Sequence, residues 1–477
     1  METAQDSPAP EQIQANEQIQ ANEQIQANEQ AHMDGWNRPV GQASLPEAFR
    51  SIAVPQNATF WRRLAAFIGP GYLIAVGYMD PGNWATDISG GSVYAYALLS
   101  VVLLSNFIAI YLQALAAKLG IVTGRDLAQA CHDAYSRPVT IGLWLSAEVG
   151  IVACDVAEVI GAAIALNLLF HIPLTVGVIL TGTDVLVVLA LQGKGFRYIE
   201  ALIMTLIGTM MVIFGLELAY AHPNWNAALH GFLPTPQIIR DPAMLYIALG
   251  ILGATVMPHN LYLHSSIIQT RRFGKSVSDL KDTIKAAYTD STLALMLALF
   301  VNAAILVLAA AVFFRTGHHE VGDIEGAYKL LTPLLGVGLA TPLFAVGLLA
   351  SGQNSTITGT MAGQVILEGF TRFKIAPWLR RMISRLIAIV PCVFITALAG
   401  PGGTGKLLIF SQVVLSVQLS FAVVPLVQFT SDKIKMGPFV NNFAVRTLGW
   451  TLAVIIAGLN AYLVFATFFP KLVPGAS

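Results

Sequence analysis

The sequence predicts an all-α polytopic membrane protein with eleven transmembrane helices, ten of them arranged as two inverted five-helix repeats. Its composition is 55% hydrophobic and only 11% charged, far below the roughly 25% charged residues of soluble domains. From residue 61 onward, apolar stretches recur that are long enough to cross about 30 Å of hydrocarbon. Two of these stretches, five spans apart, are interrupted by proline and polar side chains.

Residues 1–60 differ from the rest of the chain. The hexapeptide Glu-Gln-Ile-Gln-Ala-Asn occurs three times in succession, at 11–16, 17–22 and 23–28. A polar, low-complexity repeat of this kind predicts a disordered tail. It lacks the charged start and apolar core of a signal peptide. We therefore expect a disordered tail over 1–60 and a membrane transporter domain over 61–477.

The spans follow one another along the domain with short connections. The expected ranges are 64–93, 95–117, 139–168, 173–191, 198–220, 244–269, 284–314, 341–369, 382–399, 407–429 and 446–468. The interruptions fall in the first and sixth spans. Because five is odd, the unit that starts at the sixth span enters the membrane in the opposite direction to the first. Spans 1–5 and 6–10 are then an inverted repeat, and the eleventh is an addition.

The distribution of basic residues predicts the orientation. With the N-terminus in the cytoplasm, 21 of the 27 Lys and Arg residues fall in cytoplasmic segments, and only Arg385 lies within a span. Short cytoplasmic loops are enriched in Lys and Arg, whereas external loops are not. The sequence therefore predicts a cytoplasmic N-terminus, an external C-terminus and an odd number of spans.

The first interruption is Asp-Pro-Gly-Asn at 80–83, and the second is Met-Pro-His-Asn at 257–260. Proline removes a backbone donor and glycine loosens the chain, so both helices should break within the membrane. Broken helices in corresponding positions of two halves mark the substrate site of many transporters. The sequence therefore places the functional site at these two breaks.

The side chains at the breaks indicate the chemistry of the site. Asp80, Asn83 and the carbonyl of Ala254 offer hard oxygen donors, which suit divalent cations. The Met257 thioether is a soft donor that Mg²⁺ and Ca²⁺ do not use, so the mixed set favours a transition metal such as Mn²⁺ or Fe²⁺. The three cysteines lie far apart in the sequence, and no Cys/His spacing typical of structural zinc is present.

Ionisable residues in other spans indicate a route for protons. Asp155 and Glu158 are three residues apart, so they share one face of a helix, and two such carboxylates could carry protons. His259 follows the second break, and histidine suits a relay because it titrates near neutral pH. Arg385 should pair with an acid inside the bundle, either as a structural contact or as part of the relay.

Three longer motifs carry a resemblance to a known family. They are Gly69-Pro70-Gly71 with DPGNWATDISGGS at 80–92, MPHNLYLHSS at 257–266, and GQNSTITGTMAGQ at 352–364 with Glu-Gly-Phe at 368–370. Together they resemble the Nramp family of proton-coupled divalent metal transporters, in its bacterial form. The resemblance implies a LeuT-like fold and proton-coupled uptake of Mn²⁺ and Fe²⁺ across the cytoplasmic membrane.

The resemblance also implies roles for particular residues. The metal ligands would be Asp80, Asn83, Met257 and the Ala254 carbonyl, with Gln412 of the tenth span joining in some states. The proton pathway would comprise Asp155, Glu158, His259, Arg381 and Arg385. The partners would be divalent metal ions, protons and the lipid bilayer, with no resident cofactor and no nucleic acid.

Other functions remain open at this stage. An amino-acid or organic-ion symporter on the same architecture is the main alternative, although Asp80 and Met257 fit such a site poorly. An intramembrane enzyme is disfavoured because neither HExxH nor GxSxG occurs. A channel is disfavoured because broken helices at the midplane suit alternating access.

Overall fold

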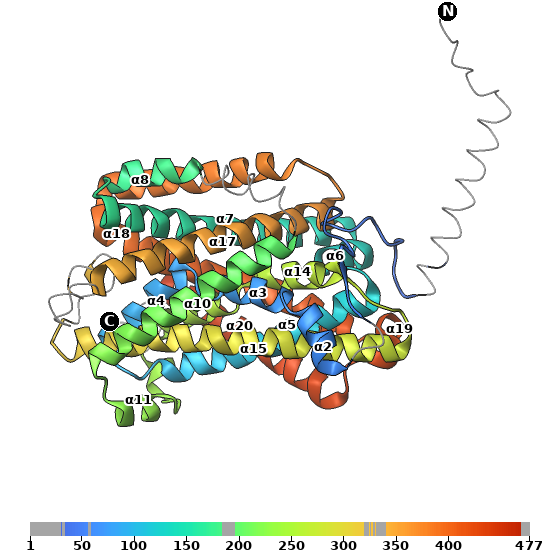
Figure 1. Cartoon of the computed structure of the whole chain (residues 1–477), viewed down its shortest axis with the longest axis horizontal. Coiled ribbons are helices and arrows are strands. Elements are labelled where there is room, and N and C mark those ends of the chain that lie inside the picture. The colour runs from blue at the N-terminus through green and yellow to red at the C-terminus, as the bar shows by residue number, and fades with distance from the viewer. Residues whose placement is uncertain are drawn as a thin grey trace, which may run out of the picture.

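The computed structural model describes residues 30, 34–55, 59–183, 196–318, 324, 326–327, 330 and 340–468. Figure 1 shows a bundle of helices that run side by side along its long axis. The elements are β1 (Ile52–Ala53), α2 (Phe60–Phe67), α3 (Pro70–Gly77), α4 (Pro81–Tyr94), α5 (Leu99–Thr123), α6 (Leu127–Ala134), α7 (Arg137–Phe170), α8 (Leu174–Leu180), η1 (Thr181–Thr183), α10 (Phe196–Ala221), α11 (Trp225–Gly231), α12 (Gln237–Arg240), α13 (Pro242–Thr255), α14 (Pro258–Ile267), η2 (Ile268–Thr270), β2 (Arg271–Arg272), α15 (Val277–Ala309), η3 (Ala310–Phe314), α17 (Ala340–Thr371), α18 (Pro377–Thr430), α19 (Lys433–Met436), η4 (Gly437–Phe439) and α20 (Phe443–Phe468).

Helices coincide with the predicted spans wherever the structure describes them, which confirms the all-α class; residues 184–191 of the fourth span lie outside the described residues. Eight segments of the described chain are long and apolar enough to cross a membrane: α5, α7, α10, α13 through η2, α15 through η3, two within α18 (Trp378–Leu398 and Gly403–Thr430), and α20. The first span is split into α3 and α4, and α8 is short. Helix α17 carries a run of Ser, Thr, Asn and Gln over 351–364. The exact number of eleven spans stays a prediction.

Both predicted helix breaks are present. Helix α3 ends at Gly77 and α4 begins at Pro81, whereas α13 ends at Thr255 and α14 begins at Pro258. Proline is favoured at the first helical position because its missing N–H would have no partner there. Each proline therefore starts the second half of its broken helix.

The backbone groups freed at the first break are satisfied inside the protein. The Asn302 amide donates to Tyr78 O at 2.9 Å. The carbonyl of Met79 accepts from the Trp84 indole at 3.1 Å and from the Ser351 hydroxyl at 2.5 Å. Lipid cannot supply such partners, so irregular backbone at membrane depth must find them in neighbouring helices.

The broken helices lie within the bundle, and the other helices surround them (Figure 1). Helix α15 packs on α3, α4 and α5, and α7 packs on α17 and α18. The outward faces of the surrounding helices are apolar: Val390, Leu398 and Val454 are 69%, 72% and 68% exposed. Exposed apolar side chains along helices of spanning length are what hydrocarbon requires. The chain is therefore a multi-pass membrane protein.

A segment before the first helix is also packed. Trp36 is 2% exposed, and the Arg125 guanidinium lies 4.4 Å from its ring centroid. The Ser44 hydroxyl donates to Asp126 at 2.6 Å, and Ile52 of β1 pairs with Arg271 of β2. The packed region thus begins earlier than the boundary at residue 61 that the sequence suggested. The three hexapeptide repeats lie outside the described residues.

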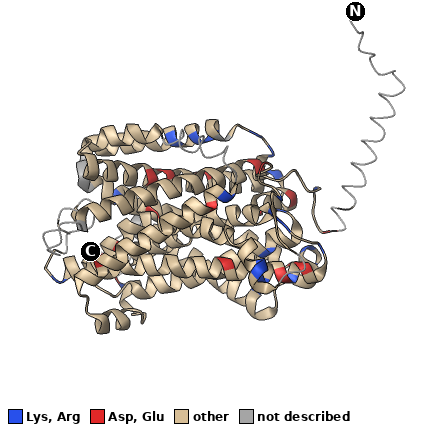
Figure 2. Ribbon diagram, in the orientation of Figure 1, with Lys and Arg blue, Asp and Glu red and all other residues tan. Residues whose placement is uncertain are grey.

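The described chain starts and finishes at opposite ends of the bundle. Trp36 contacts Phe429 near the end of α18, with ring centroids 5.7 Å apart. Helix α20 then runs back along α18, because Asn460 donates to Ser416 O at 3.0 Å. Figure 2 shows charged positions gathered where α2, α6 and α19 lie. The position of the two ends of the described chain at opposite ends of the bundle agrees with an odd number of spans.

Candidate metal site

Asp80 lies at the first break and caps α4. Its Oδ1 accepts hydrogen bonds from the backbone N–H and the side-chain Nδ2 of Asn83, both at 2.8 Å. Its Oδ2 is buried and has no hydrogen-bond partner among the described residues. A carboxylate this deep in a membrane protein is costly and needs compensation. A cation beside Oδ2 would provide that compensation.

The second break lies directly against the first. Asn83 Nδ2 also donates to Ala254 O at 2.9 Å, and Asn83 Oδ1 accepts from Asn302 at 3.3 Å. Met257 precedes α14, and its sulfur would lie 3.4 Å from a Cβ placed on Gly77. Four of the sequence-predicted ligands are therefore brought together by hydrogen bonds and by close packing of the two breaks.

Gln412 of α18 completes the group. A Cβ on Gly82 would lie 2.0 Å from Gln412 Nε2, and a Cβ on Gly253 would lie 2.0 Å from Gln412 O. Glycine at both positions therefore lets α18 approach α4 and α13 closely. Gln412 Oε1 is buried with no hydrogen-bond partner in the described part of the chain. The structure thus places the fifth predicted ligand at the same point.

The donor set determines which ions the site can hold. It offers one carboxylate, two amide side chains, one backbone carbonyl and one thioether. Nowhere in the described ranges do three or more His, Cys, Asp and Glu side chains form a group that could hold a metal. A single charged ligand with weak neutral donors suits an ion that must be released again, whereas tight structural zinc sites use Cys and His.

The predicted acidic pair is joined to both predicted arginines. Arg381 of α18 donates to Asp155 Oδ1 and to Glu158 Oε2, the latter at 2.7 Å. Arg385 Nη1 lies 3.3 Å from the same Glu158 oxygen. All four side chains are at most 2% exposed. Two carboxylates and two guanidiniums therefore balance in charge inside the bundle.

His259 is connected to this cluster through a residue that the sequence analysis did not select. The Cys154 sulfur lies 3.8 Å from His259 Nε2 and 3.6 Å from Glu158 Oε1, within hydrogen-bonding range for sulfur. His259 follows Met257 by two positions. A chain of polar contacts therefore leads from the second break to the acidic pair. The available signal was the spacing of Cys154 and Glu158, four residues apart on one helix face.

Other contributing residues were also missed. Thr356 of α17 donates to Glu158 at 3.2 Å and accepts from Arg385 at 2.9 Å. Arg380 pairs with Glu148 at 3.0 Å. Asn302, which supports the first break, is an isolated polar residue in a very apolar helix, and this isolation was the signal that could have identified it.

A second ionic cluster holds the N-terminal end of α3. Arg271 donates to Phe67 O and Ile68 O, each at 2.9 Å, and pairs with Glu200 at 2.7 Å. Asp290 of α15 accepts from Gly71 N at 2.7 Å. Burial lowers the pKa of Arg271, and Glu200 opposes this shift. The start of α3 is therefore held by α10, β2 and α15.

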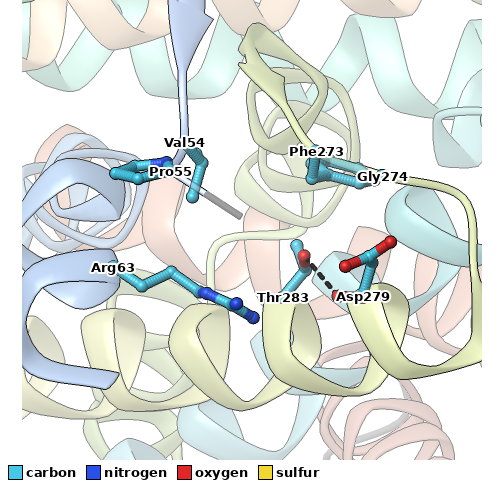
Figure 3. A pocket seen from close by; sticks show the side chains of 7 residues that line it. All are labelled: Val54, Pro55, Arg63, Phe273, Gly274, Asp279 and Thr283. Atoms are coloured by element: carbon cyan, nitrogen blue, oxygen red, sulfur yellow. Dashed lines mark hydrogen bonds between the residues drawn. The ribbon is translucent and has the colours of Figure 1, made fainter. Parts of the chain in front are cut away.

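Figure 3 shows a small pocket lined by residues of α2, of α15 and of the segments that follow β1 and β2. Its volume is about 10 Å³, which is room for a single water molecule. The lining residues are Val54, Pro55, Arg63, Phe273, Gly274, Asp279 and Thr283. None of the predicted metal ligands lines this pocket, so it is separate from the site at the two breaks.

Comparisons with known proteins identify the family to which the chain belongs. The Nramp family, described as natural resistance-associated macrophage protein-like, matches residues 71–466. A divalent metal cation transporter MntH of Listeria monocytogenes is 58% identical, and the match covers 91% of this chain and 96% of that protein. A manganese transporter of Eremococcus coleocola, solved with an aromatic bis-isothiourea compound, is 40% identical with a TM-score of 0.82; the match covers 90% of this chain and 92% of that one.

A more distant structure shares the fold alone. MhsT in complex with L-phenylalanine is 14% identical with a TM-score of 0.56, and the match covers 83% of this chain and 98% of that one. The fold is therefore the LeuT-like architecture that the resemblance implied. The family match and the 58% identical relative each extend over most of the sequence. The chain belongs to the Nramp family.

Proposed function

We propose that this protein carries divalent transition-metal ions, Mn²⁺ and Fe²⁺, into the cytoplasm together with protons by alternating access. One observation carries the proposal: Asp80 Oδ1 and Ala254 O, from the two helix breaks, converge on a single nitrogen of Asn83 at 2.8 and 2.9 Å. Two oxygen acceptors aimed at one positively polarised group also form a cation site. The printed names of the Listeria and Eremococcus relatives support the same substrate class.

Asn83 would have two roles in this site. Its Nδ2 now donates to both acceptors, and its Oδ1 accepts from Asn302. An amide can exchange its donor and acceptor ends by rotation. When a metal binds, the Asn83 side chain would turn, so that Oδ1 joins Asp80, Ala254 O, Met257 and Gln412 around the ion.

The proton route would begin beside the metal. His259, Cys154 and Glu158 form a line of polar contacts, and Arg381 joins Glu158 to Asp155. A proton on this cluster adds one positive charge, because two carboxylates and two guanidiniums otherwise balance. A divalent ion at Asp80 repels that charge strongly in a medium of low dielectric constant. Metal binding would therefore expel a proton toward Asp155.

We place the protein in the cytoplasmic membrane, with the N-terminus inside and the C-terminus outside. The bias of Lys and Arg toward one set of loops supports this orientation, as does the return of α20 along α18. The proposal includes metal ions and protons as substrates and lipid as the surroundings, with no resident cofactor and no nucleic acid. No observation favours an amino-acid substrate, because a fold likeness at 14% identity does not indicate what is bound.

Transport by the purified protein in proteoliposomes tests this function. With an inward proton gradient, we expect Mn²⁺ uptake accompanied by acidification of the interior, and no uptake from an amino-acid panel. Asp80→Ala should nearly abolish uptake because it removes the only carboxylate among the donors. The exposed Arg62→Ala is the control for expression and reconstitution. Uptake by Asp80→Ala at the control's rate, or amino-acid uptake by the unchanged protein, would refute the proposal.

A further inference from the structure

A cavity of about 440 Å³ opens beside the first turns of α7, where the packed N-terminal segment meets α6 and the end of α17. This volume lies within the range of roughly 300–1,000 Å³ typical of ligand pockets. Its polar lining is formed by Arg38, His132, Arg137, Thr140, Trp144 and Thr371. None of these residues takes part in the metal site or the acidic cluster described above.

The cavity has positive charge available for a ligand. Arg137 is exposed, and among the described residues it has no hydrogen-bond or ion-pair partner. Arg38 uses one nitrogen to donate to His132 O at 2.8 Å, a neutral acceptor that leaves its charge uncompensated. Two guanidiniums that line the same cavity favour an anion with several oxygens, such as a phosphate ester.

Neighbouring acids do not cancel this charge, because other residues already pair with them. Asp133 of α6 is held by Arg125 at 2.9 Å and by Arg372 at 2.5 Å. Glu148 of α7 is held by Arg380 at 3.0 Å. Each acid therefore has its own basic partner.

The remaining polar lining can accept hydrogen bonds. His132 Nδ1 donates to Phe370 O at 2.7 Å, so the other nitrogen of the neutral ring is an acceptor. Thr140 donates its hydroxyl proton to Ser136 O at 3.1 Å, which leaves its oxygen able to accept. Acceptors beside two guanidiniums suit a phosphate group that also carries hydroxyl groups.

An apolar track leads away from the cavity along α7. Ile141, which lines the cavity, and Leu145 and Val149 are 44%, 53% and 56% exposed. They recur every four residues and so share one face of the helix. Trp144 donates to Glu148 at 3.0 Å, which fixes its ring beside the cavity, and tryptophan is enriched where membrane proteins meet lipid headgroups. A charged cavity continuous with an apolar track matches a phospholipid better than a soluble anion.

We propose that this cavity binds the phosphoglycerol headgroup of an anionic phospholipid, and that an acyl chain lies along Ile141, Leu145 and Val149. Arg38 and Arg137 contact the phosphate, and His132 and Thr140 accept from the glycerol hydroxyls. On the topology proposed above, the lipid belongs to the cytoplasmic leaflet. The site does not depend on which substrate the protein transports.

Native mass spectrometry of the full-length protein in detergent can measure binding of phosphatidylglycerol and of phosphatidylcholine with the same chains. Phosphatidylglycerol should bind more tightly, and Arg137→Ala should weaken it by about fivefold, the usual effect of one basic residue at an anionic surface. Arg62→Ala removes an equally exposed arginine that does not line the cavity. It should leave phosphatidylglycerol binding unchanged.

Three results would overturn the proposal. Equal losses in Arg137→Ala and Arg62→Ala would mean that lipid follows the overall surface charge. Equal binding of the two lipids would mean that the arginines do not discriminate between an anionic and a zwitterionic headgroup. Glycerol phosphate that binds as tightly as phosphatidylglycerol would make the cavity a site for a soluble anion. Because Arg137 is exposed and has no described partner, its substitution should not disturb folding; a matching melting temperature checks this.

Discussion

Asn83 shows how single residues connect the two broken helices. It contacts Asp80 of the first break, Ala254 of the second and Asn302 of α15. The Asp80 carboxylate and the Ala254 carbonyl that it contacts both belong to the proposed ligand set, so the contacts that stabilise the breaks also organise the site. A substitution here should affect metal binding and local stability together. At the neighbouring proposed ligands, an effect on metal binding can be separated more cleanly from an effect on stability.

Met257 should act as a selectivity filter against alkaline-earth ions. Its sulfur can stabilise a transition metal but gives Ca²⁺ and Mg²⁺ no hard ligand in place of a lost water. In Met257→Ala we expect Cd²⁺ uptake to fall sharply, Mn²⁺ uptake to fall less, and competition by Ca²⁺ to rise. Uptake of each metal with and without excess Ca²⁺ measures this. Equal losses for every metal with unchanged Ca²⁺ competition would show that Met257 only fills space.

Asp155 should serve the proton rather than the metal. It lies in the arginine-linked cluster, and the metal ligands do not contact it in any hydrogen bond or ion pair described here. Asp155→Asn keeps the shape of the side chain and removes one negative charge beside Arg381. Proton flux per metal, or the pH dependence of uptake, should change while Mn²⁺ affinity stays within about threefold. Loss of Mn²⁺ binding in a calorimetric titration would instead identify a ligand.

At the scale of elements, the two breaks could be predicted because proline and glycine act locally. Pro81 and Pro258 each stand at the first position of a new helix. The contacts across the bundle could not be predicted, because Cys154, Asn302 and Thr356 meet their partners only after distant helices pack. The family resemblance supplied Gln412 and Arg381, for which the residue pattern alone gave little signal, whereas Arg385 was selected because it lies inside a span.

The cluster around Arg271 should control access to the site from the end of α3. Its guanidinium joins two backbone carbonyls of the preceding segment to Glu200. Removing it in Arg271→Ala should free that end of α3 and let reagents reach the interior. Cys154 is a native reporter, since it is buried between His259 and Glu158.

Thiol labelling in a background without Cys131 and Cys392 measures this opening. Arg271→Ala should label severalfold faster at Cys154 than the parent protein. Arg272→Ala, the exposed neighbour in β2, is the matched control. If both variants label at the parent rate, the cluster does not gate the site.

In the molecule as a whole, the packed N-terminal segment is the part whose structure could be predicted least well from the sequence. Trp36 and Ser44 attach it to α18 and to the loop before α6, although residues 34–55 show no helical or strand periodicity. Single residues that make such tertiary contacts produce no repeating pattern in a sequence. The spans, by contrast, follow from long apolar runs, and these predicted the bundle.

Docking of this segment should make stability depend on pH. Burial raises the pKa of Asp126 to about 7, although hydrogen bonds from Ser44 and backbone amides oppose the shift. The folded protein binds this proton more tightly than the unfolded chain does. The resulting stabilisation is complete below pH 3.8 and is lost as the pH rises through about 7.

The melting temperature should therefore fall between pH 5 and pH 8, by roughly 2–4 °C from this group. Asp126→Asn keeps an oxygen that can accept from Gln129 N and should remove that part of the pH dependence. Thermal unfolding in detergent at the two pH values gives the comparison. An identical pH dependence in wild type and variant would assign the effect to other groups.

We propose that one transition-metal ion binds between the two helix breaks. Anomalous diffraction from crystals grown with Mn²⁺ locates the ion directly, with no assumption about transport. We expect a single strong peak within coordination distance of Asp80, Ala254 O and Met257, with the Asn83 amide turned so that its oxygen faces the ion. A peak beside Asp155 and Glu158, with none between the breaks, would contradict it.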